Sequence, residues 1–80
     1  MSKFEKLLQR IKKLDKELRF DELKKVLESY GYIMTVPGGG SSHCTFRKKG
    51  KHSITIPKHE PIKKIYVLMV KEVVEGEDAE

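Results

Sequence analysis

The spacing of hydrophobic residues changes twice along this chain, and these changes are the feature that most constrains its fold. Up to Tyr30, hydrophobic residues recur every three or four positions, which is typical of amphipathic helices. From His43 to Ile56 they alternate with polar residues, as in strands that bury one face. The helical spacing returns after Pro61. This order predicts an α+β fold, in which helices pack on one face of a three-stranded antiparallel sheet.

Two helical segments precede the predicted sheet. Ser2 begins a capping box of the form Ser-x-x-Glu, so a first helix is expected to start there and to continue to Leu14. A second helix is expected from Phe20 until Gly31, because glycine readily adopts the left-handed conformation that ends many helices. The sequence between residues 15 and 19 leaves open whether these are two separate helices or one bent helix.

The predicted strands lie in the middle of the chain. Tyr32 to Val36 is rich in β-branched and aromatic residues and predicts the first strand. The run from Pro37 to Ser42 is expected to form a loop, because glycine and proline interrupt strands. Lys49 to Lys51 is expected to form the turn between the second and third strands, and Pro57 is expected to end the third.

Alternation along the strands predicts which side chains face the core. Successive side chains of a strand point to opposite sides of the sheet, so Cys44 and Phe46 are expected on the buried face, which Ile54 and Ile56 continue. The opposite face is expected to be open and available for function. The side chains predicted there are those of His43, Thr45, Arg47, Ser53 and Thr55.

A last helix is expected to begin at Pro61, because a proline at the first position of a helix loses no hydrogen bond. Its hydrophobic positions follow the helical rhythm and are expected to pack on the sheet. These positions are Ile62, Ile65, Tyr66, Met69, Val70, Val73 and Val74.

The distribution of charge narrows the functions open to such a fold. The chain of 80 residues has room for one core, and its net charge is +5. Seven of the residues from 47 to 64 are lysine or arginine, against one acidic residue, whereas residues 76–80 form an acidic tail. This imbalance favours a surface that binds a polyanion, although lysines that only keep a small protein soluble explain it equally well.

Cysteine and hydrophobic content argue against several classes of protein. Cys44 is the single cysteine, so the chain can form neither an internal disulfide nor a zinc site with paired cysteines. No stretch is hydrophobic enough for a signal peptide or a membrane span. We therefore expect a cytoplasmic protein without a membrane partner, and no metal or other cofactor is indicated.

The most unusual stretch is the glycine-rich loop that leads into His43. Glycines allow a backbone to approach a phosphate closely, and a histidine can accept or donate a proton near neutral pH. The loop is not followed by Gly-Lys-Ser/Thr, so it is not a nucleotide-binding P-loop. On the residues alone, a plain hairpin loop and a functional loop both remain open.

Four short segments resemble the HicA family of toxins, in the same order along the chain. Gly40 to Phe46 resembles the family's Gly-Ser-His-x-x-Phe signature, with one additional serine before the histidine. Ile54 to His59 looks like the strand and the Pro-x-His that follow this signature. Arg19 to Tyr32 is similar to the family's leading helix with its terminal glycine. Lys64 to Val67 is similar to the first turn of the family's last helix.

The resemblance implies a fold, an activity and a partner. The fold would be double-stranded-RNA-binding-like, the activity endoribonuclease cleavage of messenger RNA, and the partner a HicB-type antitoxin that neutralises it. The chain would divide into an N-terminal helical extension over residues 1–18, a HicA-like domain over 19–75 and the acidic tail over 76–80. We expect the extension to pack on the core, with partner binding as the alternative.

The resemblance also implies that His43 is catalytic. RNA supplies its own nucleophile in the 2′-hydroxyl group, so cleavage needs a group that moves a proton and a cation that stabilises the phosphate, but no metal. His59 is the candidate for a second proton-transfer group, and a polar cap of the last helix is the alternative. The residues expected to bind RNA are Gly40, Ser41, Ser42, Arg47, Lys49, Lys51 and Lys58.

Three further side chains have simpler assignments. His52, in a turn between lysines, is expected to contact phosphate or solvent. Cys44 is expected to be buried rather than nucleophilic, and Tyr66 fits the hydrophobic stripe of the last helix. Two other functions also stay open: a module that binds RNA without cutting it, which the basic stretch would equally support, and a protein-interaction domain with no nucleic-acid role.

Overall fold

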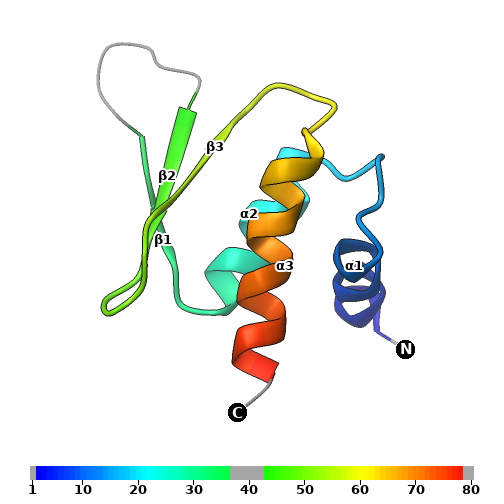
Figure 1. Ribbon diagram of the computed structural model, residues 1–80, viewed down its shortest axis with the longest axis horizontal. Helices are drawn as coiled ribbons and strands as arrows, with labels where there is room; N and C mark the ends of the chain where they lie inside the picture. The colour runs from blue at the N-terminus through cyan, green and yellow to red at the C-terminus, as the bar shows by residue number, and fades with distance from the viewer. Residues whose placement is uncertain (1, 37–42, 79–80) are drawn as a thin grey trace.

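A computed structural model of the protein describes residues 2–36 and 43–78. In these ranges a three-stranded antiparallel sheet is combined with three helices, so the predicted α+β fold is confirmed (Figure 1). Helices α2 and α3 lie beside one face of the sheet, and α1 packs against α3 on the side away from the sheet (Figure 1). The elements are α1 (Lys3–Lys12), α2 (Phe20–Ser29), β1 (Ile33–Thr35), β2 (His43–Arg47), β3 (Ile54–Pro57) and α3 (Lys64–Asp78).

The first two helices begin and end through local signals. Ser2 Oγ accepts the backbone N–H of Glu5 at 3.1 Å, which confirms Ser2 as the residue that caps the start of α1. Gly31 follows α2 with a φ of +94°, as predicted for the residue that ends this helix. The two helices are separate, and α1 ends at Lys12 rather than at Leu14, because Leu14 itself adopts a left-handed φ of 56°.

The turn between α1 and α2 is organised around Arg10. Its Nε donates to Asp15 Oδ2 at 2.9 Å, and its Nη1 donates to Glu22 Oε2 at 2.6 Å. The same two carboxylates accept backbone N–H groups, Asp15 from Glu17 at 2.8 Å and Glu22 from Arg19 at 2.9 Å. The hydrogen bond from Glu17, and secondly that from Arg10, hold the pKa of Asp15 below its ordinary value. This network ties the end of α1 to the start of α2.

The strands pair in the order β1-β2-β3, and the buried face is the predicted one. Cys44, Phe46 and Ile56 are fully buried, and Ile54 is 8% exposed. The turn between β2 and β3 closes as expected through Gly50, whose φ is +81°. The register that follows from this turn places the first residue of β2 opposite the last residue of β3.

A row of threonines crosses the other face of the sheet. Thr45 on the central strand pairs with Thr35 on one side and with Thr55 on the other. The Thr45 and Thr55 hydroxyl oxygens are 3.1 Å apart, and the Thr35 hydroxyl donates to the Thr45 carbonyl at 3.2 Å. Thr45 is therefore only 8% exposed, although it lies on the face predicted to be open, because its two neighbours flank it.

The start of the last helix was predicted wrongly. Helix α3 begins at Lys64 rather than Pro61, although Ile62, which precedes it, is only 6% exposed and lies in the core as expected. The expected packing of Ile65 on the sheet is also wrong, since 57% of this residue is exposed and Val67, at 1%, is buried instead. Residues two apart in a helix are separated by about 200° around its axis, so these two side chains cannot face the same side.

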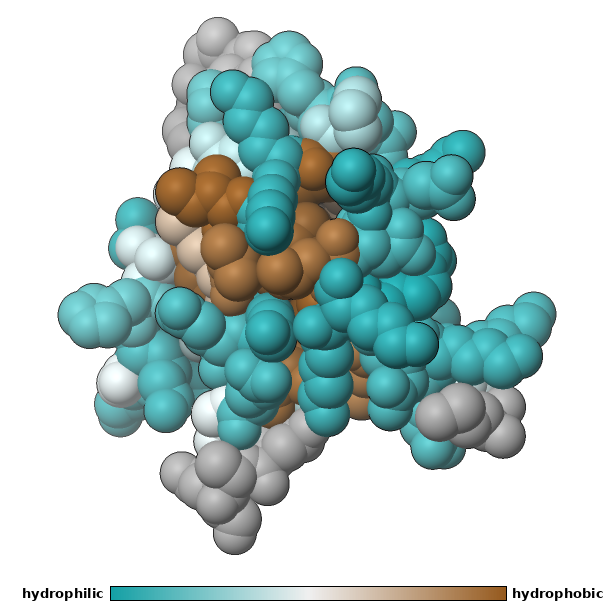
Figure 2. Space-filling view, turned by 45° about the vertical axis from the view of Figure 1, so that its right-hand side comes forward, coloured by the Kyte–Doolittle hydropathy of each residue, from teal (hydrophilic) through white to brown (hydrophobic). Residues whose placement is uncertain are grey.

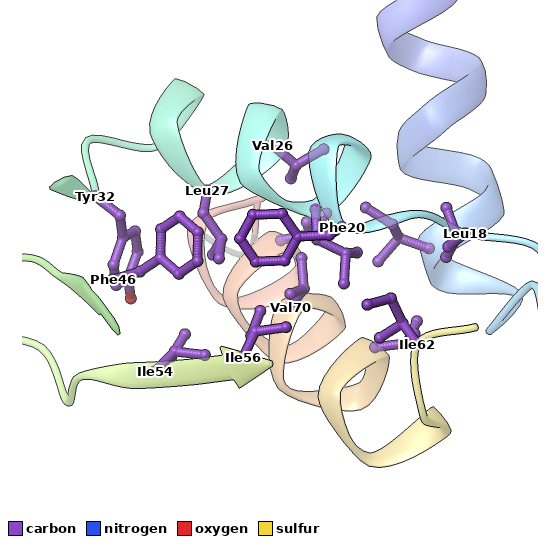
Figure 3. Close-up of a cluster of buried hydrophobic side chains, with 14 of the residues drawn as sticks. Leu18, Phe20, Val26, Leu27, Tyr32, Phe46, Ile54, Ile56, Ile62 and Val70 are labelled. Carbon is purple, nitrogen blue, oxygen red and sulfur yellow. The ribbon is translucent and has the colours of Figure 1, made fainter. Parts of the chain in front are cut away.

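One hydrophobic cluster joins the sheet to the helices (Figure 3). Phe20 from α2 and Phe46 from β2 lie within it, with ring centroids 6.1 Å apart. Leu7 and Ile11 from α1 belong to the same cluster, and Ile11 is fully buried. The N-terminal helix is therefore part of the core.

The surface is mostly hydrophilic on the side that Figure 2 shows, with hydrophobic residues gathered near the middle of that face. In the described part of the chain, the large hydrophobic residues that are exposed are Ile33, Val36, Ile65 and Leu68. None of the helices in residues 2–36 and 43–78 combines the length and the apolar character that crossing a bilayer requires.

We predict that Ile11→Ala lowers the free energy of unfolding by about 2–5 kcal/mol, because it leaves a cavity where a fully buried side chain packed. Leu8→Ala is the matched control on the same helix, and it should cost less, because Leu8 is only half-buried. Urea denaturation followed by circular dichroism measures both values. Equal losses in the two variants would contradict the placement of α1 in the core.

We predict that Asp15→Asn lowers the melting temperature at neutral pH but not in acid. The folded-state pKa of Asp15 is lowered, so its carboxylate stabilises the fold above the unfolded-chain value of about 3.9, and this stabilisation is lost as the pH falls through the folded value. Thermal unfolding at several pH values, from neutral to strongly acidic, measures the melting temperatures of the parent and of Asp15→Asn, with Glu17→Gln in the same turn as the control. If Asp15→Asn still melts at a lower temperature than the parent in strong acid, the carboxylate of Asp15 does not have this role.

Candidate functional site

Two of the three histidines line one cleft at one end of the sheet. His43 is the first residue of β2, and its partner in the register is Pro57, the last residue of β3. His59 follows Pro57 by two residues, so strand pairing brings two histidines that are 16 residues apart to the same end of the sheet. They share a cleft of about 380 Å³, which we call the histidine cleft. Its lining residues are His43, Pro57, His59, Pro61, Lys63 and Tyr66.

The segment that carries His59 is anchored on Phe20 at the start of α2. The Phe20 backbone N–H donates to Glu60 Oε2 at 3.3 Å, and the Lys58 ammonium lies 5.8 Å from the centre of the Phe20 ring. The residues on both sides of His59 are thus attached to the same residue of the helix layer. These contacts position His59 at the histidine cleft, where its side chain is exposed.

His59 does not cap the last helix, which was the alternative assignment. Helix α3 begins at Lys64, five residues after His59, so the backbone N–H groups of its first turn are too far along the chain to be capped by this side chain. The later start of the helix therefore removes that explanation for His59. Its predicted role in proton transfer stays a prediction.

Lys63 and Tyr66 are two cleft residues that the sequence analysis missed. Lys63 immediately precedes α3, and the Tyr66 backbone N–H donates to the Lys63 carbonyl at 3.0 Å. Residues three apart in a helix lie on the same side, so this spacing could have indicated that the two side chains lie together. Tyr66 packs against the core, as expected, but it is only half-buried and also lines the cleft.

Several of the predicted RNA-binding residues lie far from His43. Arg47 is at the opposite end of β2, where it pairs with Ile33, and four residues of strand span about 13 Å. Lys49 and Lys51 lie beyond Arg47, in or next to the turn that leads to β3. The basic stretch is therefore divided between the two ends of the sheet. Of the remaining predicted residues, Lys58 lies over Phe20, and Gly40, Ser41 and Ser42 are outside the described residues.

A second cleft, of about 430 Å³, lies at the basic end of the sheet. Tyr32, Ile54 and Met69 form part of its apolar wall, and His52 and Glu72 contribute polar groups. His52 is exposed there, which is compatible with its expected contact with phosphate or solvent. It is the histidine that the fold separates from the other two.

The remaining reactive groups contribute little to either cleft. Cys44 is fully buried, which confirms its expected place in the core. Among the described residues, no three side chains of histidine, cysteine, aspartate or glutamate are grouped so that they could hold a metal ion. The chemistry that these residues offer at the histidine cleft is proton transfer by imidazoles beside an ammonium and a phenol.

Comparison of the chain with protein-family models, with curated proteins and with solved structures found no match. The class of protein is therefore defined by the fold and the site alone. It is a small α+β domain with two histidines in an open cleft at one end of its sheet.

We predict that Glu60→Ala destabilises the fold by about 1 kcal/mol, because the first backbone N–H of α2 loses its acceptor. It should also change the NMR signals of the His59 imidazole, because the segment loses one of its two contacts with Phe20. Glu75→Ala, at an exposed position of α3, is the control, and should change the stability by less than about 0.5 kcal/mol. Unchanged His59 signals would show that Glu60 does not position this histidine.

Proposed function

We propose that the protein is an endoribonuclease that cleaves messenger RNA without a metal ion, with His43 and His59 as its proton-transfer groups. The observation that carries this proposal is that both imidazoles line one open cleft, although they are 16 residues apart in the sequence. A pair of histidines can hold one neutral and one protonated imidazole near neutral pH, which general acid–base catalysis requires.

The reaction follows from what RNA itself supplies. One imidazole accepts the proton of the 2′-hydroxyl group, whose oxygen then forms a bond to the adjacent phosphorus atom. The bond from phosphorus to the 5′-oxygen breaks, and the second imidazole, in its protonated form, donates a proton to this oxygen. The products are a 2′,3′-cyclic phosphate and a 5′-hydroxyl group. No electron is transferred and no metal takes part.

The family resemblance extends the proposal to a biological role. The segments similar to HicA support a toxin of a toxin–antitoxin system, with a HicB-type antitoxin as its partner and messenger RNA as its substrate. The order of α2, three antiparallel strands and α3, with both helices on one face, supports the double-stranded-RNA-binding-like fold that the resemblance implies. A toxin that cleaves messenger RNA would act in the cytoplasm.

A module that binds RNA without cutting it is the second candidate function. The observation that favours it is the position of Arg47, Lys49 and Lys51, which are exposed at the end of the sheet away from the histidine cleft. Such a module would bind through phosphate contacts, so its affinity would fall as the salt concentration rises. Its affinity for RNA would depend on these cations and not on the histidines.

We predict that the purified protein cleaves a labelled single-stranded RNA in EDTA, and that His43→Ala and His59→Ala each lower the rate by about 10²–10⁴-fold. Both variants should still bind RNA almost normally, because an imidazole that transfers a proton contributes little to affinity for phosphate. His52→Ala is the matched control, since it removes a histidine at the other end of the sheet. Binding without cleavage by all four proteins would establish the binding module instead.

A modified substrate can assign the two imidazoles to their roles. A substrate with sulfur in place of the 5′-oxygen has a leaving group that needs no proton. It should restore most of the rate to the variant that lacks the general acid, and none to the variant that lacks the general base. A 2′-deoxy residue at the cleavage position should abolish cleavage by every form, because the nucleophile is then absent.

A further inference from the structure

We propose that Lys63 and Tyr66 bind the scissile phosphate in the histidine cleft, which admits one nucleotide of a single RNA strand. This inference rests on the proposed function. It adds which groups hold the phosphate, and that the substrate is single-stranded. It starts from the fact that two imidazoles move protons but leave the negative charge of the phosphate without a fixed cation.

Lys63 is the cation that the fold brings to this site. Arg47, which the sequence favours for the phosphate, lies about 13 Å along β2 from His43. Lys58 is adjacent to His59 in the sequence, but its ammonium lies over the Phe20 ring, 5.8 Å from the ring centre. Lys63 lines the same cleft as the histidines. Its ammonium offers three N–H donors to the phosphate oxygens, which carry more charge in the transition state than in the substrate.

Tyr66 supplies a second donor from a more rigid position. Its ring is half-buried and packs against the hydrophobic core, so the side chain has little freedom to lose when a ligand binds. Its phenol group can donate one hydrogen bond to a non-bridging phosphate oxygen. Lys63 immediately precedes α3 and Tyr66 lies in its first turn, so the two side chains reach the cleft from the same end of this helix.

The form of the cleft favours a single strand. Its volume of about 380 Å³ is at the lower end of the range of sites that enclose a small molecule. Pro57 and Pro61 form apolar walls beside the polar groups, which suits a ribose or a base next to the phosphate. A nucleotide that is paired in a duplex would have to leave its helix to enter, at a cost of a few kcal/mol.

The test compares Lys63→Ala with Lys64→Ala. Both variants remove one exposed lysine side chain, but Lys64 does not belong to the lining of the cleft. In single-turnover cleavage, Lys63→Ala should lower the rate about 10²–10³-fold, whereas Lys64→Ala should stay within about threefold of the parent. Lys63→Arg should recover part of the loss, since it restores the charge. Equal losses in the two alanine variants would overturn the assignment of Lys63.

Tyr66→Phe tests the second donor and keeps the ring in the core. It should lower the single-turnover rate about tenfold, while the melting temperature stays within a few degrees of the parent. A duplex that contains the same cleavage sequence should react at least about tenfold more slowly than the single strand. An unchanged rate for Tyr66→Phe would remove Tyr66 from the phosphate site, and equal cleavage of duplex and single strand would refute the strandedness.

A binding measurement separates this inference from the proposed function. Adenosine 3′-monophosphate, titrated into labelled protein, should shift the NMR signals of His43, His59 and Tyr66, and Lys63→Ala should weaken its Kd about tenfold while Lys64→Ala does not. If this pattern is found but no RNA is cut, the phosphate site stands and the ribonuclease proposal fails. If RNA is cut but both lysine variants bind and cleave alike, the ribonuclease stands and the phosphate site fails.

Discussion

The contacts of Phe20 are the interaction on which the rest of the structure depends. Its ring packs against Phe46 with a centroid distance of 6.1 Å, which joins α2 to the central strand of the sheet. Its backbone N–H donates to Glu60, and the Lys58 ammonium lies over its ring, which joins α2 to the segment after β3. One residue therefore connects the core to the segment that positions His59. Stability and the geometry of the histidine cleft are linked through it.

The antiparallel register gives the two ends of the sheet different properties. At one end, the pairing of His43 with Pro57 brings both cleft histidines together, next to the start of α3. At the other end, Arg47 and the basic turn lie near His52 and the second half of α3. Proton-transfer groups and most of the predicted phosphate contacts are thus separated along the sheet. A cation for the phosphate must come from another part of the chain, and in our proposal it is Lys63, which immediately precedes α3.

Local signals in the sequence predicted much of the fold, whereas the residues near the cleft were predicted less well. The cap at Ser2, the helix end at Gly31 and the burial of Cys44 were each predicted from the local sequence pattern, and all three are confirmed. The predicted start of the last helix at Pro61 was wrong, because the helix begins at Lys64. Ile65 was also expected to be buried, but it is 57% exposed, and Val67 is buried instead. The catalytic role of His43 stays a prediction.

The sequence by itself determined which segments form helices and strands and which strand face is buried, because hydrophobic periodicity acts over a few residues. It also indicated the two histidines as candidates. Only the tertiary structure decided that His43 and His59 share a cleft, that Lys63 and Tyr66 join them, and that Arg47 does not. These relations depend on the register between β2 and β3 and on the packing of α3. Both are set by contacts between residues far apart in the chain, which no local pattern encodes.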